Sequence, residues 1–273
     1  MRRGVARTLV IAVALVVSLL PLAWTALAAF GIVPDNSRRP PVWQARPTLD
    51  KFGEIAAAAP DFWRQLATGT TIAAAAAALT VFVAFLGAYA LARASSRRGR
   101  PLSQGFLVLA SLPVMAYVYP LAEMLRRAGL ADSIVGVTLS EAAVTAPLAV
   151  YVLHGFLGQL SREWEEAAWL EGAGLGRILR QVVLPFAAPT LGATLIILFV
   201  MDWNQLVLPL VLAGVEVRTI PVTMVDFFTF ERELEWPVAA AALLVSLVPL
   251  LVLVTVFHRL VQRFSLQGAS SSG

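Results

Sequence analysis

The chain has 273 residues, of which 59% are hydrophobic and 14% are charged, and its mean hydropathy is +0.77. These values exclude an ordinary soluble domain and indicate a membrane protein. The formal net charge of +4 does not indicate nucleic-acid binding, because the basic residues gather at the ends of apolar segments, as membrane orientation requires. With no cysteine and two histidines, the chain has no means to form disulfides or thiolate metal sites, and we expect no metal site.

The first predicted membrane span covers about residues 8–30. It follows three arginines and is long enough to cross a hydrocarbon core of about 30 Å. The basic start and the small residues near its end also fit a secretory signal peptide, but the run is longer than the apolar part of such a signal. We interpret it as an uncleaved anchor. Residues 31–64 are rich in Pro, Arg, Asp and Trp and predict an external loop, with an interfacial helix possible over 50–64.

Three further spans are predicted in the middle of the chain. The second covers about residues 65–92, and its alanines at 73–78 offer a surface where helices pack closely in lipid. The arginines that follow it predict a cytoplasmic loop. The third, at about 102–122, is expected as one helix that accommodates Pro113 and Pro120. The fourth covers about 134–157.

Two ionisable residues of the fourth span lie where burial is costly. Glu141 is in its outer part and His154 is near its inner end. A charge at membrane depth marks a functional candidate, since it needs a partner or water. We therefore consider Glu141 a candidate for the substrate pathway, with packing near a helix end as the alternative for both residues.

A polar stretch, residues 158–185, separates the fourth and fifth spans. It predicts one short helix over about 162–173, ended by Gly172 and Gly174, and a second over about 175–183, stopped before Pro185. On the first helix, one face combines a bulky anchor with small residues that another protein surface could approach closely, with Glu166 on its flank. The residues of this face are Trp164, Ala167, Ala168 and Glu171.

The last two spans are predicted over about 186–210 and 237–258. The fifth is interrupted in its outer half by Asp202, Trp203 and Asn204, which could bind polar cargo or join helices to one another. The loop over 213–236 is rich in carboxylates, and arginines after the sixth span return the tail to the cytoplasm. Six spans with both termini in the cytoplasm follow from this pattern.

One spaced set of residues in the polar stretch resembles a known motif, the EAA loop of permease subunits of ATP-binding cassette (ABC) importers. The matching residues are Glu166, Ala167, Ala168, Gly172, Val182, Leu184 and Pro185. The alternative is an amphipathic linker on the membrane surface. The sequence AYALAR at 88–93 and the Trp203-Asn204 pair are similar to features of the carbohydrate-importing, maltose permease (MalG-like) branch of this family. The tail lacks the ending usual in that branch.

The resemblance implies a fold, a coupling site and partners. The fold would be an all-α membrane protein of the type I ABC importer class, with six transmembrane helices, a cytoplasmic coupling helix and one permease domain over 1–273. The residues implied to couple to the ATPase are Glu165, Glu166, Ala167, Ala168, Glu171, Gly172, Ala173, Leu184 and Pro185. Asp202, Trp203, Asn204 and Glu141 stay as candidates for the substrate pathway.

The implied partners are two ABC ATPase subunits, a second permease, a solute-binding protein and the bilayer of a prokaryotic inner membrane. The chain has no G-x-x-x-x-G-K-[ST] phosphate loop, so it is not expected to be an enzyme, and the ATPase subunits would bind ATP and Mg. The implied cargo is a sugar or oligosaccharide. Permeases for another polar solute, such as a glycerol phosphate ester, a polyamine or a phosphonate, remain alternatives, as does an energy-independent channel or secondary carrier.

Overall fold

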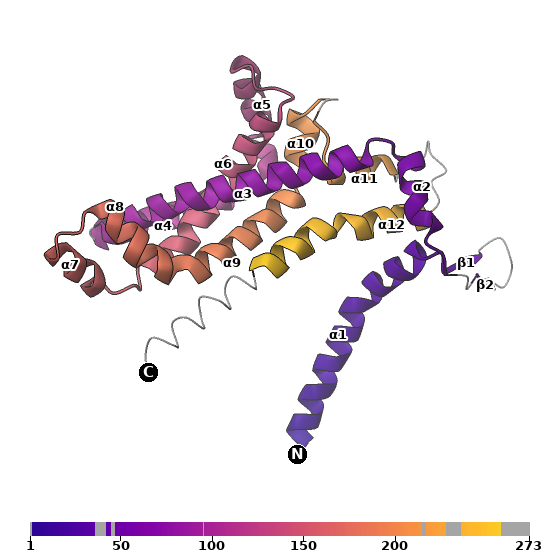
Figure 1. Ribbon diagram of the computed structural model, residues 1–273, viewed down its shortest axis with the longest axis horizontal. Coiled ribbons are helices and arrows are strands. Elements are labelled where there is room, and N and C mark those ends of the chain that lie inside the picture. The colour runs from indigo at the N-terminus through magenta and orange to yellow at the C-terminus, as the bar shows by residue number, and fades with distance from the viewer. Residues whose placement is uncertain are drawn as a thin grey trace. The chain divides into compact units, whose positions relative to one another are not determined.

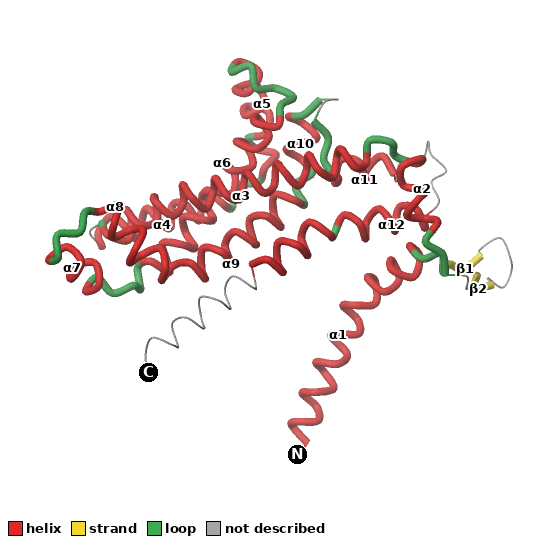
Figure 2. Tube along the Cα trace, in the orientation of Figure 1, coloured by secondary structure: helices red, strands yellow, loops and turns green. Residues whose placement is uncertain are grey.

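The computed structural model describes residues 2–35, 42–44, 47–94, 96–214, 217–227 and 236–257. Helices make up most of these residues, and two short strands pair with each other (Figure 2). Five helices within the described ranges are long and apolar enough to cross a membrane, namely Arg7–Ala29, Phe62–Arg93, Ile134–Leu157, Leu175–Trp203 and Trp236–Phe257. Many of their large apolar side chains are exposed, which fits a surface that contacts lipid.

By contact clustering the chain divides into two compact units. Unit 1 comprises residues 1–66 and 223–248, and in it α1 (Arg2–Ala29) and α2 (Asp50–Ala58) both pack against α12 (Trp236–Ser246) (Figure 1). The strands β1 (Val33–Asp35) and β2 (Val42–Gln44) are antiparallel, with Val33 opposite Gln44. The sequence did not predict them, because three residues are too few to show the alternation of a strand.

Unit 2 comprises residues 67–222 and 249–273. Its elements in chain order are most of α3 (Phe62–Arg93), then α4 (Ser96–Ala110), η1 (Val114–Ala116), α5 (Val118–Arg127), α6 (Ile134–Leu157), α7 (Glu163–Leu170), α8 (Leu175–Ile178), η2 (Leu179–Val183), α9 (Leu184–Trp203), α10 (Val207–Leu212) and the start of α11 (Ile220–Phe227). Helix α6 packs against α4, α9 and α10, so it lies at the centre of this unit (Figure 1).

The alanine tract of α3 is the small-residue surface that the sequence predicted. Ala73, Ala76 and Ala77 are almost fully buried. One turn later, the Thr80 hydroxyl donates to the carbonyl of Ala142 on α6 at 3.2 Å. Small side chains let two helix backbones approach closely, and a hydroxyl-to-carbonyl bond of this kind joins helices in lipid.

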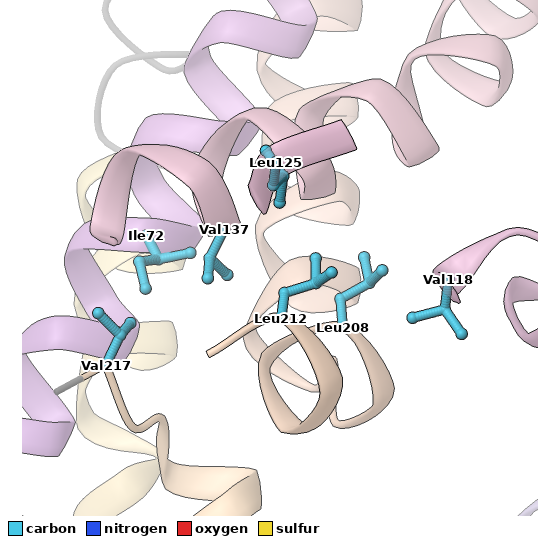
Figure 3. Close-up of a cluster of buried hydrophobic side chains, with 7 residues drawn as sticks. All are labelled: Ile72, Val118, Leu125, Val137, Leu208, Leu212 and Val217. Atoms are coloured by element: carbon cyan, nitrogen blue, oxygen red, sulfur yellow. The ribbon is translucent and has the colours of Figure 1, made fainter. Parts of the chain in front are cut away.

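An apolar cluster gathers the short elements of unit 2 (Figure 3). Its buried members come from α3, α5, α6, α10 and the loop after α10, and are Ile72, Val118, Leu125, Val137, Leu208, Leu212 and Val217. Asp132 adds a polar tie, because its Oδ1 accepts from the backbone N–H of Gly214 at 2.7 Å and of Val217 at 3.1 Å. Together these contacts connect the turn before α6 to the loop that follows α10.

The third predicted span differs from the structure. The prediction of one helix over 102–122 is wrong, because α4 ends at Ala110 and α5 begins at Val118. Pro113 has no N–H to donate and disfavours the α conformation at Leu112, so the helix stops here. Pro120 is in the first turn of α5, where a missing N–H breaks no helical hydrogen bond. The fourth span, by contrast, has the bounds that the sequence predicted.

The fifth predicted span, 186–210, and the helix before it are also corrected. Helix α8 does not stop before Pro185 but continues through the π-helical η2 into α9, and α9 ends at Trp203. The π-helical turn shifts the backbone bonding just before the proline, which lets the chain pass a residue that cannot donate. At the other end, Asn204 closes the helix by donating from Nδ2 to the Val200 carbonyl at 2.7 Å.

Candidate coupling site

Helix α7 ends in a turn that requires a glycine. Gly172 has a φ of +82°, its N–H donates to the Trp169 carbonyl at 2.9 Å, and the N–H of Ala173 donates to the Ala168 carbonyl at 3.0 Å. This is the pattern of a Schellman motif, in which a left-handed residue satisfies the last carbonyls of a helix. The first predicted helix, expected over 162–173, is therefore shorter, over Glu163–Leu170, but Gly172 ends it as predicted.

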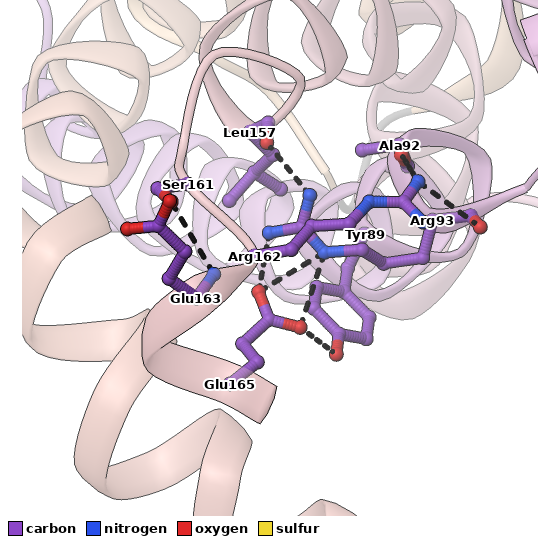
Figure 4. Close-up of polar contacts among 8 residues, drawn as sticks. All are labelled: Tyr89, Ala92, Arg93, Leu157, Ser161, Arg162, Glu163 and Glu165. Carbon is purple, nitrogen blue, oxygen red and sulfur yellow. Dashed lines mark hydrogen bonds and ion pairs between the residues drawn. The ribbon is translucent and has the colours of Figure 1, made fainter. Parts of the chain in front are cut away.

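Glu165 is buried and holds α7 to the end of α3 (Figure 4). Its Oε2 accepts from the hydroxyl of Tyr89 at 2.8 Å, and its carboxylate forms an ion pair with the guanidinium of Arg93, including bonds from Nε at 3.0 and 3.1 Å. The Arg93 and Glu165 side chains are only 15% and 5% exposed. A paired and hydrogen-bonded carboxylate is stable in such a place, whereas an unpaired one is costly.

Three further bonds complete this junction of helix ends. Arg93 also donates from Nη1 to the carbonyl of Leu157, the last residue of α6, at 3.3 Å. Arg162, which precedes α7, donates from Nη2 to the carbonyls of Ala92 and Arg93 at 3.2 and 3.4 Å (Figure 4). The side chains of Tyr89, Arg93, Arg162 and Glu165, which we call the junction, thus link the ends of α3 and α6 to the start of α7.

The remaining face of α7 is open. Glu166 and Ala167 are exposed, and so are Trp164, Trp169 and Leu170, the last at 91%. The Trp164 ring lies 6.1 Å, centroid to centroid, from the ring of Phe186 on α9. Neighbouring aromatic and aliphatic side chains that stay exposed beyond the ends of the spans are typical of a protein-binding surface.

The other predicted coupling residues are distributed around this face. Glu171 is exposed at the end of α7, and Ala168 and Ala173 are half-buried. Leu184 and Pro185 are exposed at the start of α9. The structure therefore separates the two adjacent glutamates of the predicted coupling site, because Glu165 is part of the junction while Glu166 stays available to a partner. The sequence held one signal for this arrangement, since Tyr89 and Arg93 are four residues apart on one helix face.

The candidate pathway residues Glu141 and Asp202 are buried in unit 2, at 1% and 5% exposure. Within the part of the chain that the structure describes, both carboxylate oxygens of Glu141 and Oδ2 of Asp202 have no hydrogen-bond partner. They are on α6 and α9, which pack together. Buried polar atoms without partners are rare in proteins, so this pair is a marked exception among the described side chains.

Trp203 and Asn204 have local roles in the structure. The Trp203 ring stacks on Phe199 with a centroid distance of 6.0 Å, and a Cβ added to Gly69 of α3 would lie 3.4 Å from this ring. These contacts pack Trp203 within α9 and beside α3, and its proposed stacking on a sugar ring stays a prediction. Asn204 is exposed and bonds the end of its own helix. His154, the other ionisable residue of α6, is half-buried.

Residues 84–265 match the family described as "Binding-protein-dependent transport system inner membrane component". The match covers most of the chain, including the junction, α7 and the exposed face. The chain belongs to this family of permeases. As a member of that family with several apolar helices, the permease is a multi-pass membrane protein.

Similar proteins support the assignment over 66% of the chain or more. The permease is 28% identical to the diacetylchitobiose uptake system permease protein of Streptomyces coelicolor, over 88% of this chain and 87% of that protein. It is 33% identical to the trehalose transport system permease protein of Mycobacterium tuberculosis, over 66% and 67%. Its fold is similar to a chain of a bacterial ABC transporter involved in alginate import, with a TM-score of 0.72, 19% identity and coverage of 94% and 95%.

Proposed function

We propose that this permease carries a sugar or oligosaccharide into the cytoplasm as one subunit of an ATP-driven, binding-protein-dependent importer. The names of its relatives support the cargo class, since they include permeases for diacetylchitobiose, trehalose and maltose. The proposed partners are two ABC ATPase subunits that bind ATP and Mg, a second permease and an extracytoplasmic solute-binding protein. Transport proceeds by alternating access, in which ATP closes the ATPase subunits and reorients the membrane helices.

The observation that carries this proposal is that α7 is exposed on one face while its buried Glu165 attaches it to α3. Helix α7 presents Glu166, Trp169 and Leu170 outward, while Glu165 fixes it through Arg93 to the end of a membrane-spanning helix. A partner that moves α7 would therefore also move α3. We propose residues 158–185 as the cytoplasmic coupling loop, with the ATPase subunit on the open face of α7.

We further propose the type I permease arrangement with six spans and both termini in the cytoplasm. The five long apolar helices would supply five of the spans, and α4 and α5, interrupted at Pro113, would form a broken third span. A break in a membrane helix is tolerated where protein or water surrounds it. The tail after Phe257 and the carboxylates Glu231, Glu233 and Glu235 of the loop over 213–236 lie outside the described residues.

Glu166 provides the most direct test of the coupling surface. We expect Glu166→Ala to insert normally and unfold at the same temperature, because the side chain is exposed. Loss of a charge-assisted bond to the partner should weaken assembly with the ATPase subunit by about tenfold. Co-purification and ATP-driven uptake in proteoliposomes measure this. The control is Glu54→Ala, a half-buried carboxylate of α2 that pairs with Lys51 and lies outside the coupling loop. Wild-type assembly and uptake of the Glu166 variant would contradict the proposed surface.

The pair of buried carboxylates provides a second test, for the substrate pathway. Glu141→Gln and Asp202→Asn keep the shape of each side chain and remove its charge, so we expect no loss of thermal stability. If these oxygens accept hydrogen bonds from cargo hydroxyls, uptake should fall by about ten- to a hundredfold, since a bond to a charged group contributes about 1.5–3 kcal/mol. The measurement is uptake of radiolabelled sugar at matched protein levels. Full uptake by both variants would leave helix packing as their role.

The same carboxylates are the one observation that favours a different cargo. Two unpartnered acids at membrane depth would also suit a cationic solute such as a polyamine. Ligand binding by the solute-binding protein of the same complex distinguishes the two cargo classes. A solute-binding protein that binds sugars supports the first proposal, and a solute-binding protein that binds polyamines supports the alternative.

A further inference from the structure

A cavity lies beside the junction, at the ends of α3 and α6 and the start of α4. Its volume is about 360 Å³, and the polar side chains that line it are Arg100, His154, Gln159 and Arg162. Neither the coupling surface nor the candidate pathway uses this space. The spans α3 and α6 end at Arg93 and Leu157, so the cavity is at the level where lipid headgroups meet the protein.

The cavity is strongly cationic. Two guanidinium groups and an imidazole line it, and none of the described residues that form its wall is acidic. Gly99 and Arg100 belong to the first turns of α4, a 15-residue helix whose N-terminal end carries a partial positive charge. The two guanidinium groups are always charged, and together they favour the binding of an anion in this recess.

Glycine keeps the space in front of the imidazole open. A Cβ at Gly99 would lie 3.7 Å from Nε2 of His154 and 2.6 Å from the carbonyl oxygen of Leu91. Any larger residue would therefore intrude between α3 and α4 and fill part of the recess. A water molecule occupies about 30 Å³ in the liquid, so the cavity has room for a phosphate group together with an attached glycerol or sugar.

Two of the donors are held in place before any ligand binds. Arg162 donates from Nη2 to the carbonyls of Ala92 and Arg93, and Gln159 donates from Nε2 to the carbonyl of Gly155 at 2.9 Å. The planar guanidinium presents several N–H groups at once, which matches the oxygens of a phosphate. Arg100 of α4 is exposed, also lines the cavity and adds a second cation.

We propose that this cavity binds a phosphate group, supplied either by the headgroup of an anionic phospholipid or by a free phosphate compound. A phosphodiester at this depth would need no movement of the spans, and anionic headgroups are attracted to arginines near a membrane surface. Because Arg162 directly precedes α7, the bound anion would also brace the start of the coupling helix.

The lipid source is tested with the intact importer complex in nanodiscs of phosphatidylcholine that contain a minor fraction of phosphatidylglycerol. Phosphatidylglycerol that stays bound after detergent exchange is quantified by mass spectrometry. We expect Arg100→Gln and Arg162→Gln each to lower the retained lipid by about tenfold, the effect of one charge-assisted bond. The matched control is Arg7→Gln, which removes the same charge from an exposed position at the start of the first span that is not among the residues lining the cavity.

The free-compound source is tested by equilibrium dialysis of the delipidated complex against labelled inorganic phosphate. A free phosphate compound is identified by saturable phosphate binding that Arg100→Gln removes, in a complex that does not retain phosphatidylglycerol. Phosphate bound to the ATPase subunits is not affected by this substitution, so it can be told apart. Arg100→Gln is the decisive variant, because Arg162 also donates to carbonyls at the end of α3 and its replacement changes the structure as well as the charge. The proposal is overturned if neither probe shows binding that depends on Arg100, or if Arg7→Gln lowers retention as much as the cavity variants.

Discussion

Glu165→Ala is expected to destabilise the permease by about 3–5 kcal/mol and to abolish ATP-driven uptake. The change leaves the guanidinium of Arg93, only 15% exposed, without its carboxylate, and removes the acceptor of the Tyr89 hydroxyl. An uncompensated charge in such a place costs far more than the loss of an exposed ion pair. Thermal unfolding in detergent measures the loss of stability, and uptake in proteoliposomes measures the loss of function.

The same helix offers a matched control for this prediction. Glu163 is a second glutamate of α7 and is exposed, so Glu163→Ala should cost less than about 1 kcal/mol through the helix dipole alone. Replacing both partners by methionine, in Arg93→Met with Glu165→Met, should recover most of the stability, because no charge is then left buried. If Glu165→Ala unfolds at the same temperature as Glu163→Ala, the junction does not hold α7 to α3.

Gly172→Pro is expected to leave the permease in the membrane but to uncouple ATP hydrolysis from uptake. Gly172 has a φ of +82°, whereas proline is locked near −65°, and the substitution also removes the N–H that bonds the Trp169 carbonyl. The end of α7 must then unwind, and the exposed face loses its shape. The measurements are the amount of permease in the membrane, the ATPase rate of the complex and sugar uptake.

A neighbouring glycine serves as the control for this prediction. Gly174 has an ordinary φ of −73°, and a Cβ added there would meet no atom within 4 Å, so Gly174→Ala should behave as wild type. Gly172→Ala should be intermediate, since an L-residue in the left-handed region costs about 1–2 kcal/mol. Normal uptake by Gly172→Pro would contradict the assignment of residues 158–185 as the coupling loop.

Much of the fold was predictable because the bilayer imposes a simple rule. A span needs about 20 apolar residues whose backbone groups bond within the helix, and such runs are visible in a sequence. Helix α6 matches its predicted bounds, and α3 differs by a few residues at each end. Two of the errors occurred at prolines, and the two prolines had opposite effects. Pro113 ends a helix, whereas Pro185 is passed with the help of the π-helical η2.

The sequence by itself determined the membrane class and the position of the polar stretch, because both depend on composition and local spacing. It also identified Gly172, since a glycine after a short amphipathic helix is a local stop signal. Only the tertiary structure showed which of the adjacent glutamates Glu165 and Glu166 is buried and which is exposed. Arg93 is 72 residues from Glu165 along the chain, and local sequence patterns do not show which distant charged residue a carboxylate contacts.

The cavity beside the junction depends on tertiary structure for the same reason. Its cations, Arg100 and Arg162, are far apart in the sequence and come together only when the ends of α3 and α6 lie beside the start of α4. In the sequence they were simply basic residues next to membrane spans. Helix packing decided that one glutamate of α7 anchors it, that the next stays open to a partner, and that the neighbouring arginines enclose a recess.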